Sequence, residues 1–170
     1  MTAAAIAHGT VPFPVGEVHG SQFTALDAIL GEEFIGEKGK VYRLYTSTAA
    51  VASPASLCFF RTAAGGTAVT IGAATTPVCG VAVADQVALA AGDYFFLQVD
   101  GEMVLTGKTS HGVANVGDGV KPAANGEVEV SGTTNTTTVD LDLPLVVHTI
   151  ASNVLTAYPA KGKLWGFPAD

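Results

Sequence analysis

The sequence predicts a mainly β protein: a compact barrel or sandwich of short antiparallel strands, with an extended N-terminal arm and at most one short helix. Between Gly80 and Val130, short apolar runs alternate with Gly-Asp, Asp-Gly and Asn-Gly dipeptides. These dipeptides accept the positive φ angles of tight turns, so the chain is expected to fold back on itself repeatedly. No helix-length periodic segment interrupts this stretch. The regular spacing of the turn signals is typical of a barrel or sandwich.

The first 20 residues are predicted to form an extended arm. They contain Pro12, Pro14 and three glycines, with little periodicity. Proline fixes φ and cannot donate to a strand ladder, so such a segment lies at an edge or crosses a surface. We expect its apolar centre to contact a neighbouring subunit or another partner. That predicted interface consists of Val11, Pro12, Phe13, Pro14 and Val15.

Residues 21–31 are the one helix candidate. Ser21 could cap the first turn, Gly31 could end the last, and apolar residues between them fall at near-helical spacing.

From Lys40 onward the pattern predicts strands. In 41–45, Tyr42 and Leu44 alternate with Arg43, so the two apolar side chains are expected on one face. The expected strands are 41–45, 57–61, 68–71, 79–83, 94–99, 103–106, 127–130 and 138–147. The polar stretch 131–138 is expected to be an exposed loop, and Trp165 to anchor a closing strand. Without a long linker, residues 21–170 are predicted to be a single β-rich domain.

Composition narrows the classes of function. Charged residues make up 14% of the chain and hydrophobic residues 48%, whereas about 25% charged is usual for a soluble domain. So few charges favour an assembly in which neighbours cover part of the surface. The net charge of −7 and only eight Lys plus Arg argue against a nucleic-acid partner. No apolar run approaches the roughly 20 residues of a transmembrane helix, so no membrane partner is expected.

No catalytic, metal or cofactor site is predicted. The histidines do not show the close ligand spacings of zinc sites; they are His8, His19, His111 and His148. Ser110 and His111 are adjacent, so in a strand they would point to opposite faces, which is wrong for a nucleophile and its base. No phosphate-binding Gly-rich motif is present. We therefore expect no enzyme activity.

Two acidic pairs allow two interpretations. Asp140 and Asp142, like Glu127 and Glu129, are two residues apart and share a strand face. They could form a calcium site or a carboxylate pair. Their regular alternation with apolar residues favours the solvent-facing side of a strand.

Cys58 and Cys79 both lie in apolar runs. Free cysteine is among the most buried residue types, so both are expected to be free buried thiols. The N-terminus lacks a basic n-region and a full secretory h-region, which predicts a protein that stays in a cytoplasm.

Four segments carry a resemblance to a known family. Residues 36–45, Gly-Glu-Lys-Gly-Lys-Val-Tyr-Arg-Leu-Tyr, resemble the opening of small head proteins of tailed bacteriophages. The stretch from Gly80-Val-Ala through residues 92–101, Gly-Asp-Tyr-Phe-Phe-Leu-Gln-Val-Asp-Gly, resembles their core. Val116-Gly-Asp-Gly-Val and Asn125-Gly-Glu-Val-Glu-Val match the turn and strand that follow in those proteins.

The resemblance implies a capsid decoration, or cement, protein. Such a protein is a small β-barrel-like domain, usually a homotrimer, bound to the major capsid protein on the outside of the head. It would be assembled in the host cytoplasm and reside on the virion surface. It would stabilise the shell by clamping capsomers.

Two other classes remain open at this stage. The chain could be another virion component, such as a tail or host-binding module, which would show exposed aromatic residues or a glycan-binding surface. It could also be a small trimeric β enzyme acting on nucleotides. The chain has only two arginines, Arg43 and Arg61, and neither lies in a phosphate-binding motif, which disfavours the enzyme.

Overall fold

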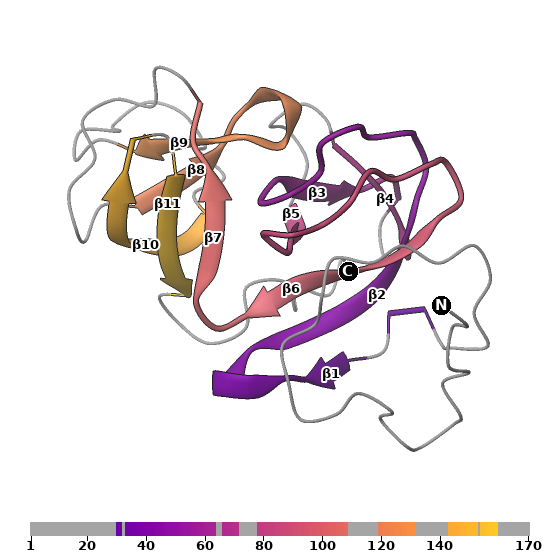
Figure 1. Ribbon diagram of the computed structural model, residues 1–170, viewed down its shortest axis with the longest axis horizontal. Helices are drawn as coiled ribbons and strands as arrows, with labels where there is room; N and C mark the ends of the chain where they lie inside the picture. Colours follow the sequence, from indigo (N-terminus) through magenta and orange to yellow (C-terminus); the bar gives the residue numbers. More distant parts are fainter. Residues whose placement is uncertain are drawn as a thin grey trace.

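A computed structural model describes residues 30–31, 33–63, 66–71, 78–108, 119–131, 143–152 and 154–159 (Figure 1). This part of the chain is mainly β and contains no α-helix, which confirms the predicted fold class. The strands are β1 (Glu33–Ile35), β2 (Val41–Ser47), β3 (Cys58–Arg61), β4 (Ala68–Thr70), β5 (Val78–Ala82), β6 (Tyr94–Asp100), β7 (Met103–Thr106), β8 (Gly119–Pro122), β9 (Val128–Ser131), β10 (Leu143–Ala151) and β11 (Val154–Pro159). Two short 3₁₀ segments, η1 (Glu37–Gly39) and η2 (Ala124–Gly126), form turns.

The first sheet closes on itself. Its strand order is β1-β2-β4-β3-β5-β6, and β6 also pairs with β2. The ring β2-β4-β3-β5-β6 therefore has no free edge strand. Strand β1 pairs with the first residues of β2, and β4 pairs with the last residues of β2 on the same side. All its pairings are antiparallel except β2 with β4, which is parallel and departs from the purely antiparallel expectation. Closure satisfies backbone groups that an open edge would leave exposed.

The second sheet has the order β7-β11-β10-β8-β9. A bridge between Gly107 and Val128 joins its two outer strands, and the Lys108 amide donates to the Val128 carbonyl at 2.9 Å. Figure 1 shows the two sheets side by side, with β6 leading from one directly into β7 of the other.

One apolar cluster is shared by the two sheets. From the first sheet it includes Cys58 and Phe60, and from the second Met103, Leu105 and Val128. Two further clusters belong to the first sheet alone, one around Phe59 and Phe95 and one around Tyr42 and Leu44. The shared cluster means that part of the apolar core of each sheet is buried against the other.

The predicted turns take the backbone conformation that motivated them. Asn125 and Gly126 have φ of 60° and 76°, and Gly92 and Gly101 have φ of 92° and 84°. These are left-handed conformations that Gly and Asn adopt at low cost. The dipeptides in the sequence therefore mark real reversals of the chain.

The strand predictions need three additions, and most of the predicted bounds shift by one or more residues. β1, β8 and β11 were not predicted, because they are short or carry Gly or Pro at an end. The last predicted strand, 138–147, overlaps β10, which continues to Ala151. The arm at 1–20, nearly all of the candidate helix at 21–31 and the segment around Trp165 lie outside the described residues. The division into an arm and a single domain stays a prediction.

Candidate functional site

The predicted interface residues Val11, Pro12, Phe13, Pro14 and Val15 lie outside the described part of the chain. The same holds for Asp140, Asp142 and the side chains of all four histidines. Those predictions therefore stay predictions.

The two cysteines are free and buried, as expected. They lie on different strands and belong to different apolar clusters. Burial raises the pKa of each thiol to about 12. A thiol held protonated in this way is a poor nucleophile at neutral pH, so neither sulfur has the character of a reactive group.

Glu129 serves the closure of the second sheet. Its carboxylate accepts a hydrogen bond from Lys108 Nζ at 2.7 Å and lies 3.7 Å from Lys121 Nζ. The hydrogen bond from Lys108 is the main reason that the pKa of Glu129 is lowered. Lys108 follows the bridge between Gly107 and Val128, so this ion pair spans the seam between β7 and β9.

Both arginines contact residues within the first sheet. Arg43 donates from Nε and Nη2 to one carboxylate oxygen of Glu33, at 3.1 and 2.5 Å. Burial opposes the charge of Arg43, but hydrogen bonds to Glu33 and Tyr45 outweigh it and raise its pKa. Arg61 donates to the Tyr45 hydroxyl at 3.4 Å, and its Nε is buried without a hydrogen-bond partner in the described structure.

The described residues bear on metal binding and on membrane spanning. No group of three or more His, Cys, Asp or Glu side chains could hold a metal ion within these ranges. Across the same ranges, no helix is long and apolar enough to cross a membrane.

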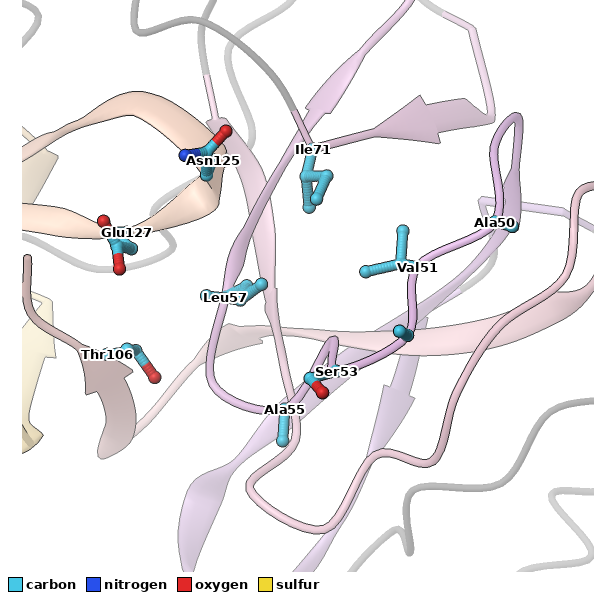
Figure 2. A pocket seen from close by; sticks show the side chains of 10 residues that line it. Ala50, Val51, Ser53, Ala55, Leu57, Ile71, Thr106, Asn125 and Glu127 are labelled. Atoms are coloured by element: carbon cyan, nitrogen blue, oxygen red, sulfur yellow. The ribbon is translucent and has the colours of Figure 1, made fainter.

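Among the described residues, an open pocket of about 530 Å³ lies at the junction of the two sheets (Figure 2). One wall is the loop that joins β2 to β3, and the other is η2 with the end of β7. Val51, Leu57 and Ile71 lie across its middle in Figure 2. The remaining lining residues are mostly small or polar: Ala50, Ala52, Ser53, Ala55, Thr106, Asn125 and Glu127.

The sequence alone did not reveal this pocket. Its walls come from residues 50–57, Ile71, Thr106 and residues 125–127, which only the packing of the two sheets brings together. The loop from Ala50 to Ser56 carries no periodic pattern. The neutral side chains of this loop are the one feature of the sequence that could have indicated the pocket. Neutral loop residues are too common to identify a site.

No protein-family model matches the chain. No curated protein matches it either. Among solved structures, the chain is similar to the head fiber gp8.5 N base of bacteriophage phi29, with a TM-score of 0.45 and 16% sequence identity. The match covers 74% of this chain and 98% of the other.

Proposed function

We propose that the protein is a structural component of a tailed-bacteriophage virion that decorates the outer surface of the capsid. In this role it clamps capsomers of the major capsid protein, acts as a homotrimer and catalyses no reaction. It joins the particle in the host cytoplasm and remains on the virion surface.

The main support comes from where the family-like segments lie. The segment at 36–45 ends in β2, and the segments from Gly80 and Gly92 form β5 and β6. These three strands are direct neighbours, because β6 pairs with both β5 and β2. The resemblance therefore follows one continuous piece of the first sheet.

Two residues of these segments, Gly80 and Gln98, have structural roles. At Gly80, a Cβ atom would lie 2.7 Å from the Cβ of Leu97 on the next strand. Gln98 is buried and donates from Nε2 to the carbonyls of Asp100 and Glu102, at 3.0 and 2.7 Å. A motif that maintains strand packing suits a rigid clamp.

The direct test compares particles that carry the protein with particles that lack it. Under heat or osmotic shock, decorated particles should retain their DNA longer. The effect should rise with occupancy, because a ligand that binds only the intact shell stabilises it by mass action. Equal DNA loss from both kinds of particle would contradict the proposal. If the protein instead binds host cells, a tail or host-binding role should replace it.

The arm can be tested separately. Deleting residues 1–15 removes Val11–Val15 and should weaken attachment to the capsid while the β domain stays folded. Co-sedimentation of the shortened protein with particles measures its binding to the capsid. Undiminished binding would place the contact elsewhere in the chain.

A further inference from the structure

The interior of the ring β2-β4-β3-β5-β6 is filled by one apolar cluster. Each of the five strands contributes to it, with Tyr45, Val69, Phe59, Cys79 and Phe95 among its members. Successive side chains of a strand point to opposite faces. Leu44 and Phe96, the neighbours of Tyr45 and Phe95 along the chain, therefore point out of the ring.

The side chains that point outward from β2 and β6 belong to a separate cluster. It includes Phe34 on β1, Tyr42 and Leu44 on β2, and Phe96 on β6. The rings of Phe34 and Phe96 meet edge to face, with their centroids 5.3 Å apart. We call these four residues the outer patch.

The outer patch is buried although it lies outside the ring. The exposed fractions of Phe34, Tyr42, Leu44 and Phe96 are 3%, 1%, 0% and 2%. A sheet face reaches such values when another layer of chain packs on it. Within the described ranges, no residue of the second sheet belongs to this cluster, and Figure 1 shows β1 on the side of β2 that is turned away from the second sheet. A further segment is therefore needed to cover the outer patch.

The chain reaches the outer patch at Leu30. This side chain packs against the cluster, and the amide of Gly31 donates to the carbonyl of Leu44 at 2.8 Å. Residues that precede Leu30 are therefore tied to the edge of the patch. As a helix, residues 21–29 would span roughly 13 Å. That length is enough to cross three neighbouring strands, which lie about 4.8 Å apart.

We propose that residues 21–29 of the same chain cover the outer patch and anchor the N-terminal arm to the β domain. Phe23, Leu26 and Leu30 follow one another at the spacing of one helix face, so a helix here can turn all three toward the patch. The base of the arm then lies over β1, β2 and β6, on the side away from the second sheet. This anchor does not depend on the proposed role on the capsid.

Nuclear Overhauser contacts in the full-length protein test the anchor directly. With labelled leucine methyl groups, Leu26 should show contacts to the aromatic rings of the outer patch. The C-terminal residues 160–170, which include Leu164 and Trp165, are the alternative cover. Contacts to the patch from these residues and none from Phe23 or Leu26 would overturn the proposal, as would an absence of contacts from either segment.

A mixture of labelled and unlabelled protein distinguishes one chain from two. Contacts of Leu26 within its own chain are expected. If they appeared only between different chains, the segment would cover a neighbouring copy and the proposal would be wrong.

Charge substitutions supply a second, independent test. Leu26→Asp would place a carboxylate against the apolar patch and should raise the unfolding constant roughly 30-fold or more. Ala28→Asp is the matched control, because in the predicted helix Ala28 lies on the side opposite Leu26. The control should change the constant by no more than about 2-fold. Leu26→Ala is the milder variant if Leu26→Asp does not fold, and about 10-fold or more is expected.

Urea unfolding measures these constants. Equal effects of Leu26→Asp and Ala28→Asp would contradict the anchor. Capsid binding does not enter either test, and deletion of residues 1–15 leaves residues 21–29 in place. A failure of capsid attachment and a failure of the anchor therefore give different results.

Discussion

At Gly126 the backbone conformation and the local packing both require glycine. Its φ is 76°, and a Cβ atom there would lie 2.7 Å from the carbonyl oxygen of Cys58. Gly126 belongs to the turn η2 beside the second sheet, whereas Cys58 begins β3 of the first. The missing side chain therefore allows the two sheets to approach closely. Gly39 has nearly the same φ, 74°, but a Cβ there would meet nothing within 4 Å.

These two glycines form a matched pair for mutagenesis. Gly39→Ala should cost about 1–2 kcal/mol of unfolding free energy, because only the left-handed conformation is strained. Gly126→Ala should cost a further 1–3 kcal/mol or so, because the added methyl group must displace a backbone carbonyl. Urea unfolding of both variants measures the difference. Equal losses would show that the contact with Cys58 relaxes without cost.

The buried thiols predict a loss of stability in alkali. Both pKa values are raised from 9.0 to about 12 in the folded protein. Below pH 9 both thiols are protonated in the folded and in the unfolded chain, so their contribution to the free energy of unfolding has its full value. Above pH 9 the unfolded chain releases protons that the folded chain keeps. The free energy of unfolding should therefore fall by up to about 1.4 kcal/mol per pH unit for each thiol, until the pH nears 12.

Unfolding in urea between pH 7 and 10.5 measures this slope. In Cys79→Ala one thiol is gone, so the decline above pH 9 should be shallower than in the wild type. Titrations of Lys and Tyr affect both proteins and cancel in the comparison. An unchanged slope would contradict the assignment to the thiols.

At the scale of elements, the connection from β6 to β7 links the two sheets. Gln98, 5% exposed, sits near its start and donates from Nε2 to the carbonyls of Asp100 and Glu102. The Gly101 amide donates to the Asp100 carboxylate at 2.7 Å. These bonds lie within the turn that redirects the chain from one sheet to the other.

Replacing Gln98 with Leu keeps the approximate side-chain size and removes both bonds. We expect a loss of about 1–3 kcal/mol, because buried acceptors lose their donor. Thermal and urea unfolding give the size of the loss. Hydrogen exchange should locate it, with faster exchange at Glu102 and Met103. A loss below about 0.5 kcal/mol would mean that water or the backbone replaces the amide.

The sequence predicted the strands in which alternating apolar and polar residues, or a long apolar run, lie next to a turn dipeptide. β2, β6 and β7 are of this kind. β1 has only three residues, and β8 spans Gly119–Pro122, so local patterns are too weak to indicate either. Neither sheet closure nor the junction pocket could be predicted, because both depend on contacts between distant residues. No local sequence pattern indicates the bridge between Gly107 and Val128.

At the scale of the whole molecule, the shared apolar cluster couples the two sheets. Leu105 on β7 is fully buried within it, together with Phe60 and Val81 of the first sheet. Removing apolar volume here affects both sheets at once. The described structure therefore predicts one cooperative unfolding unit, even though the strands form two closed sheets.

Leu105→Ala tests this coupling. The change should cost about 2–5 kcal/mol, as truncation of fully buried leucines does, and unfolding should remain a single transition. Val87→Ala, at an exposed position of the first sheet's β5–β6 connection, should change stability by less than about 0.5 kcal/mol. Hydrogen exchange followed by mass spectrometry can monitor peptides from β5–β6 and from β10–β11 separately. In Leu105→Ala both sets should gain exchange to the same extent, because they open together. If peptides of β10–β11 alone exchanged faster, the two sheets would be independent units and the cluster between them only a contact.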